Sequence, residues 1–164
     1  MKTTIPRRTS PFLSVVVMLV VAAVAPAAIL QEKNPLVGTW NANLSKSKRH
    51  PNHLFKSATF RFTISDDVVT LSYTGVNMSG VEEKGTTTFH PDGKEHPLAG
   101  MAGAVEVSRW VGAHILETVA RQDGKAIGQS TFEVSSDGKT LTANVKGTDA
   151  GGAWFEQVMV CDRE

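Results

Sequence analysis

Apolar and polar residues alternate with a period of two along most of the chain after residue 35. In residues 58–64 every second residue is Ala, Phe or Ile, and the residues between them are Thr or Arg. Residues 69–74 repeat the pattern with Val, Leu and Tyr against Thr and Ser. Such alternation places one dry and one wet face on a β-strand. No stretch beyond residue 35 has the apolar spacing of a helix, so the pattern predicts an all-β chain.

Short turn sequences separate the alternating segments. Asp-Gly-Lys occurs at 92–94, 123–125 and 137–139, and Asp-Gly between such segments predicts a hairpin turn with positive φ. Connections this short make successive strands antiparallel neighbours, so we expect an up-and-down meander. A meander of many strands removes its two exposed edges by closing on itself. Residues 36–164 are therefore predicted to form a closed antiparallel β-barrel of 8–10 strands.

The first 27 residues have the pattern of a signal peptide. Three basic residues among the first eight precede a charge-free apolar run over 12–25, and Ala25-Pro26-Ala27 supplies small residues for cleavage after Ala27. Residues 28–35 then form a linker. The alternative is an uncleaved membrane anchor, because apolar character continues to Leu30 and the run is long enough to span a bilayer. Two prolines and the alanine-rich end favour cleavage, so we expect a secreted or periplasmic protein.

Composition narrows the choice of partner and of redox chemistry. Removal of 27 residues from 164 leaves 137, enough for one domain with its own core. The removed segment carries three of the 17 basic and none of the 16 acidic residues, so 14 basic residues face 16 acidic ones, a net charge of −2. This balance favours neither nucleic acid nor an anionic membrane surface as partner. Cys161 is the one cysteine and is expected to be a buried, inert thiol.

Gly38-Thr39-Trp40, at the head of the first predicted strand, resembles the Gly-x-Trp signature of lipocalins. It is also similar to the Gly-Thr-Trp opening of fatty-acid-binding proteins, which belong with lipocalins to the calycin group. The chain likewise resembles small exported bacterial proteins described as lipocalin-like. The resemblance implies that Trp40 plugs one end of the barrel and that Arg163, at the end of the last strand, packs across the indole. It also implies a carrier of small apolar molecules, although the family's Arg-x-Tyr pair for a carboxylate ligand is missing.

The dry faces of the predicted strands supply the wall of a possible cavity. We therefore expect a non-enzymatic protein that binds a small, mainly apolar ligand inside the barrel. The alternative is a solid-cored exported module that contacts a protein partner through its surface; the oligomeric state stays open. The charges Glu106 and Arg109, and Glu117 and Arg121, are expected to form pairs on the outer face. The candidate wall residues are Phe60, Phe62, Leu71, Tyr73, Phe89, Val107, Leu116, Phe132 and Val145.

Catalytic and metal-binding patterns are weak in this sequence. There is no Gly-x-Ser-x-Gly motif, and adjacent acidic residues on a strand point to opposite faces. No catalytic residue and no cofactor is predicted. Five histidines leave a third hypothesis, a metal or haem site at the barrel mouth. His90 and His96, on either side of the 92–94 turn, are its candidate ligands, and solvated loop histidines are the favoured interpretation.

Overall fold

The computed structural model describes residues 34–51, 54–148 and 152–164. The predicted signal peptide and residues 28–33 of the predicted linker lie outside the described residues, and so does His53. Ten strands make up the described part of the chain, and no α-helix occurs in it. Accordingly, this part contains no helix with the length and apolar character needed to cross a bilayer.

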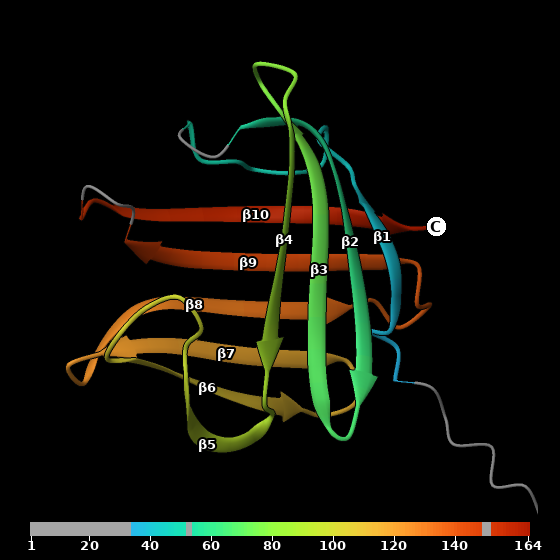
Figure 1. The fold of residues 1–164 in the computed structure, drawn as a ribbon. Helices are drawn as coiled ribbons and strands as arrows, with labels where there is room; N and C mark the ends of the chain where they lie inside the picture. The colour runs from blue at the N-terminus through green and yellow to red at the C-terminus, as the bar shows by residue number, and fades with distance from the viewer. Residues whose placement is uncertain (1–33, 52–53, 149–151) are drawn as a thin grey trace, which may run out of the picture. The chain divides into compact units, whose positions relative to one another are not determined.

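The ten strands form one sheet, and their bounds follow the alternating segments of the sequence. Every neighbouring pair is antiparallel, and the spatial order is β4-β3-β2-β1-β10-β9-β8-β7-β6-β5. In Figure 1, β2, β3 and β4 cross in front of β7 to β10, so the sheet curls over itself. The predicted all-β meander is confirmed. The strands are β1 (Gly38–Ala42), β2 (Phe55–Ser65), β3 (Val68–Asn77), β4 (Glu82–Phe89), β5 (Asp92–Pro97), β6 (Ala104–Val111), β7 (Ile115–Gln122), β8 (Lys125–Val134), β9 (Thr140–Thr148) and β10 (Trp154–Arg163).

The edges of the sheet are β4 and β5, and no ladder of hydrogen bonds joins them within the described residues. The structure is therefore a curled half-barrel, and the prediction of a barrel closed by strand pairing was wrong at this point. Asp92-Gly93-Lys94 is not a hairpin turn: Gly93 lies inside β5, where the register against β6 shifts. The Asp-Gly turns at 123–124 and 137–138 are confirmed, with φ of 74° at Gly124 and 70° at Gly138.

The core fills the end of the half-barrel where β1 pairs with β2 and β10. Trp40 is 0% exposed, and Leu36, Phe62 and Leu116 are also fully buried. Phe132 packs against Phe62 with 5.3 Å between ring centroids, in an edge-to-face arrangement that aromatic pairs favour. Side chains from opposite parts of the curled sheet thus meet here and leave this end solid.

Trp40 and Arg163 form the predicted plug. The Arg163 guanidinium carbon lies 4.0 Å from the centroid of the Trp40 ring, and Trp40 Nε1 donates a hydrogen bond to the Leu36 carbonyl at 3.0 Å. Arg163 also donates to backbone carbonyls, including that of Val37 at 3.1 Å. Gly38 has a φ of 149°, and a Cβ there would lie 2.6 Å from the Arg163 guanidinium. The glycine in the motif is therefore required to admit the arginine.

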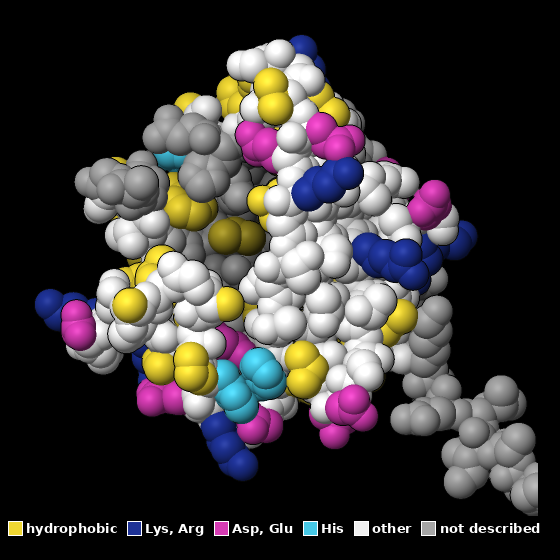
Figure 2. Space-filling view, in the orientation of Figure 1, with side chains coloured by type: hydrophobic (Ala, Val, Ile, Leu, Met, Phe, Trp, Pro, Cys, Tyr) yellow, Lys and Arg dark blue, Asp and Glu magenta, His cyan; other side chains and the backbone are white. Residues whose placement is uncertain are grey.

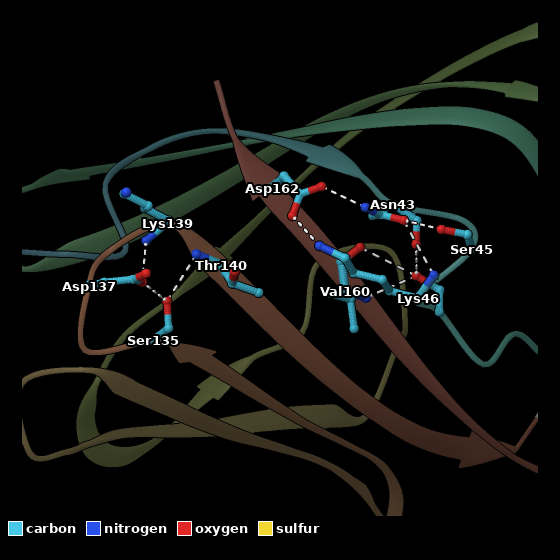
Figure 3. A network of polar contacts seen from close by, with 10 residues as sticks. Asn43, Ser45, Lys46, Ser135, Asp137, Lys139, Thr140, Val160 and Asp162 are labelled. Carbon is cyan, nitrogen blue, oxygen red and sulfur yellow. Dashed lines mark hydrogen bonds and ion pairs between the residues drawn. The ribbon is translucent and has the colours of Figure 1, made fainter.

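Polar side chains link the loop after β1 and the β8–β9 turn to the neighbouring strands beside this solid end (Figure 3). Asn43 Nδ2 donates to Asp162 at 2.6 Å, and Lys46 forms an ion pair with the same carboxylate at 3.2 Å. In the β8–β9 turn, Ser135 Oγ donates to Asp137 at 2.6 Å. Both networks hold a loop onto β9 or β10 beside the plug.

Candidate ligand-binding cavity

A cavity of about 680 Å³ lies between the inner faces of β2, β3 and β10, beyond the solid core. Its volume falls within the range of small-molecule sites, roughly 300–1,000 Å³. In Figure 2, a hollow with hydrophobic side chains in its depth is visible on the face of the molecule that is turned toward the viewer. The lining residues are Pro51, Leu54, Phe55, Ala58, Phe60, Tyr73, Gly75, Asn77, Met78, Ser79, Glu83 and Gln157.

Aromatic side chains form much of the cavity wall. Phe60 and Tyr73 are direct cross-strand partners of β2 and β3, so their side chains lie on the same inner face. The Tyr73 ring lies over Gly85 of β4, where any Cβ would overlap it. Leu54 and Met78 are exposed at the cavity although they are large and apolar. The wall thus combines apolar side chains with the polar side chains of Asn77, Ser79, Glu83 and Gln157.

Gln157 is the polar group deepest in this wall. It alternates with Phe155 and Met159 on the inner face of β10 and is only 8% exposed. Its Oε1 is buried and accepts no hydrogen bond from any described residue. Nearly all buried polar atoms in folded proteins have a partner. This oxygen has almost no accessible surface, so it does not face the open space of the cavity although other atoms of Gln157 line it.

The polar groups nearer the opening are paired with one another. Asn77 Nδ2 donates to Glu83 at 2.8 Å, and Asn77 Oδ1 accepts from the backbone N–H groups of Ser79 and Val81, each at 3.0 Å. These bonds fix the β3–β4 turn at the margin of the cavity.

A second cavity of about 220 Å³ lies against the inner faces of β6 to β9, and Glu106 lines it. Glu106 is 3% exposed, so its predicted place in an outer-face pair was wrong. Its carboxylate accepts hydrogen bonds from the Ser108 hydroxyl and from the His90 backbone N–H, and His90 Nδ1 lies 3.1 Å away. These partners satisfy the buried charge and connect β6 to the end of β4, where no strand ladder forms. Arg109 pairs instead with Glu117 at 2.7 Å, while Arg121 lies 3.9 Å from Glu95.

The structure brings His90 and His96 together, as predicted, but their ring nitrogens do not point toward a shared metal position. Their rings stack with centroids 4.1 Å apart, and His96 Nε2 contacts Asp92 at 3.0 Å. Each ring therefore directs a nitrogen at a different carboxylate. Over the described ranges, no three His, Cys, Asp or Glu side chains are grouped so that they could hold a metal ion.

The predicted wall residues separate into four groups. Only Phe60 and Tyr73 line the large cavity, and Phe89 and Val145 line the small one. Val107 lies on the outer face of β6, in a groove with Arg109 and Glu117, so this assignment was wrong. The remaining candidates belong to the solid core at the plug end: Phe62, Leu71, Leu116 and Phe132.

Gln157 was not singled out from the sequence, and Glu106 was assigned to the wrong face. Gln157 could have been found as the polar position between the apolar residues Phe155, Met159 and Cys161 on one stripe of β10. Glu106 gave no such signal, because valines at 105, 107 and 111 made the opposite face of β6 look like the dry one.

Cys161 is buried beside the core, as expected. Burial, followed by the negative charge of Asp162, raises the pKa of its thiol to about 12. The thiolate form that reacts with oxidants or metals is therefore scarce at neutral pH.

No protein-family model matches this sequence, and a search of curated proteins finds no match. Among solved structures, the fluorescent protein UnaG is similar, with 18% identity and a TM-score of 0.52 over 78% of this chain and 96% of that one. Zebrafish ileal bile acid-binding protein, complexed with cholic acid, is 12% identical, with a TM-score of 0.46 over 79% of this chain and 99% of that one. Rv2717c from M. tuberculosis is 18% identical, with a TM-score of 0.47 over 85% of this chain and 98% of that one. At these identities the likeness to UnaG concerns the fold alone.

Proposed function

We propose that this protein is an exported, non-enzymatic binding protein that holds one small, mainly apolar molecule in the cavity between β2, β3 and β10. The observation that carries the proposal is the contrast inside the sheet: one end is filled with side chains, whereas the other has an open cavity of about 680 Å³. A carrier needs such a cavity, and the side chains of Leu54, Phe55, Phe60 and Met78 in its wall offer apolar contacts to an occupant.

The shape of the wall also supports a binding role. Phe60 and Tyr73 are cross-strand partners whose side chains lie on the inner face and border the cavity, which gives a bound molecule an aromatic surface.

The direct test is native mass spectrometry of the full chain after expression and export in a host. We expect a fraction of the protein to carry a single bound molecule that is lost on gentle activation. A protein that stays unloaded and also fails to bind apolar fluorescent probes would contradict the proposal and favour the surface-contact alternative.

Export is the part of the proposal that depends on the first 27 residues. We expect the protein recovered outside the cytoplasm to have the intact mass of a chain that begins at Ala28. Recovery of a chain that retains Met1 in the membrane fraction would favour an uncleaved anchor instead.

A further inference from the structure

We infer that Asp123-Gly124, in the turn between β7 and β8, is a site of spontaneous isomerisation to isoaspartate, whereas the fold protects the other two Asp-Gly pairs of the chain. The sequence repeats Asp-Gly-Lys at 92–94, 123–125 and 137–139, so the three pairs start from the same local chemistry. The structure gives them different surroundings. The inference is independent of the proposed function and assigns a covalent modification site.

The reaction needs only the chain itself and water. The Gly124 backbone nitrogen attacks Cγ of the Asp123 carboxyl group, an N–Cγ bond forms, and one water leaves with the nitrogen's hydrogen and a carboxyl oxygen. Water then opens the resulting succinimide ring. Addition at Cγ restores aspartate, whereas addition at the α-carbonyl carbon leaves the chain running through Cγ as isoaspartate. Glycine permits the attack because no Cβ shields its nitrogen, and nothing lies within 4 Å of the position that a Cβ would take at Gly124.

Both reacting groups of Asp123-Gly124 are unengaged. Among the described residues, none donates a hydrogen bond to the Asp123 carboxylate or forms an ion pair with it, and none accepts a hydrogen bond from the Gly124 N–H. Both residues are also exposed to water. The carboxyl group and the attacking nitrogen can therefore approach each other without first breaking a contact of their own.

The turn that contains this pair is weakly anchored. Asp123 has a φ of 50° and Gly124 a φ of 74°, as a two-residue hairpin turn requires, and positive φ is unfavourable for a residue with a side chain. The register of β7 against β8 shifts at Ala120, so that two residue pairs lie between the shift and the turn. A short hairpin end opens more readily than the body of a sheet. Its opening lets the Gly124 nitrogen reach Cγ of Asp123.

The Asp137-Gly138 pair is held at both reacting groups (Figure 3). Its carboxylate accepts hydrogen bonds from the Ser135 hydroxyl at 2.6 Å and from the Lys139 backbone N–H at 3.0 Å. The Gly138 N–H donates to the Ser135 carbonyl at 2.8 Å, and the Gly138 carbonyl accepts from Arg163 Nε. The attack would have to break these bonds and detach the turn from the plug.

The Asp92 carboxylate is held as well. The Lys94 backbone N–H donates to Asp92 Oδ1 at 2.9 Å, and His96 Nε2 lies 3.0 Å from the same oxygen. The Lys94 hydrogen bond, followed by that of His96, lowers the pKa of Asp92, and hydrogen bonds lower the pKa of Asp137 in the same way. Because an oxygen must leave as water, the protonated carboxyl group is the reactive form, and a lowered pKa makes that form scarcer.

The test follows the three pairs in one sample of full-length protein kept folded at pH 6. Trypsin releases them in separate peptides, residues 85–94, 122–125 and 126–139, in which chromatography and electron-transfer mass spectrometry distinguish isoaspartate from aspartate. Isoaspartate should accumulate in peptide 122–125 about tenfold faster than in either of the others, the factor that one net hydrogen bond of ordinary strength represents. Equal rates in the three peptides, or an unmodified peptide 122–125, would overturn the inference.

Unfolding provides the control for local sequence. In urea the three pairs lose their different surroundings, so their rates should become similar. A tenfold preference for peptide 122–125 that persists in urea would show that the fold is not its cause, and would overturn the inference. Ser135→Ala removes one donor from Asp137 and should raise the rate in peptide 126–139 while peptide 122–125 reacts as before. An unchanged rate in peptide 126–139 would overturn the assigned protection.

The modification should also loosen the end of the β7–β8 hairpin. Isoaspartate adds one backbone atom to a two-residue turn, which no longer matches the pairing of the flanking strands. After storage, the amides of residues 121–126 should therefore exchange hydrogen faster in the wild type than in Asp123→Gly, since Gly-Gly suits the same turn and cannot form isoaspartate. Equal exchange in the two stored proteins would overturn this consequence.

Discussion

The two ends of the curled sheet treat polar atoms in opposite ways. At the plug end, Trp40 Nε1 donates to the Leu36 carbonyl, and Arg163 donates to several backbone carbonyls. At the cavity end, Gln157 Oε1 is buried without a partner among the described residues. A buried polar group without a partner lowers stability. The plug end is therefore expected to contribute more to the stability of the fold than the cavity end.

Truncation of one aromatic residue at each end tests whether the two ends differ in packing. Trp40→Ala should lower the free energy of unfolding by about 3–5 kcal/mol, because Trp40 is fully buried in the solid core. Phe60→Ala removes a half-buried ring that borders the cavity and should lower it by only about 1–2 kcal/mol, in line with the smaller area returned to water. Urea unfolding followed by far-ultraviolet circular dichroism measures both. Equal losses would mean that the two ends are packed alike.

Glu106 tests how the half-barrel is held where β4 and β5 do not pair. Glu106→Ala leaves the Ser108 hydroxyl and the His90 backbone N–H without their acceptor, which should lower the free energy of unfolding by about 1–3 kcal/mol. Glu106→Gln keeps one acceptor and should lose less. Hydrogen exchange separates this local role from a general loss of stability. In Glu106→Ala, the exchange rate of the His90 amide should rise by a larger factor than the rates of the β9 amides. Unchanged protection of the His90 amide would contradict the link between β6 and the end of β4.

The parts of the molecule that follow from local patterns were predictable. Alternation and Asp-Gly turns gave the strands, and Gly38-Thr39-Trp40 with Arg163 gave the plug, because these residues act through close, stereochemically simple contacts. His90 and His96 were expected to lie close together, and they do, although the hairpin expected at residues 92–94 is not formed.

The cavity could not be located in this way, because its position depends on how the sheet curls. Phe62 and Phe132 are on the dry faces of β2 and β8, as expected for wall residues, but they pack on each other across the interior and fill it. The face of β6 was misassigned for a related reason. Val107 is more hydrophobic than Glu106, yet Glu106 lies inside, where the His90 backbone N–H and the Ser108 hydroxyl donate hydrogen bonds to its carboxylate.

The smallest expected effect concerns the exposed carboxylates beside the plug. The Ser135 hydroxyl lowers the pKa of Asp137, and the Asn43 amide, helped by Lys46, lowers the pKa of Asp162. Because these pKa values are lower in the folded chain than in the unfolded chain, the unfolded chain binds more protons as the pH falls. Their contribution to stability is therefore complete above about pH 4, the ordinary range for Asp, and is lost as the pH falls through the lowered values. Urea midpoints measured between pH 7 and pH 2.5 should show this loss, and Ser135→Ala with Asn43→Ala should make the curve shallower. An unchanged slope in the double variant would show that these bonds do not hold the loops in solution.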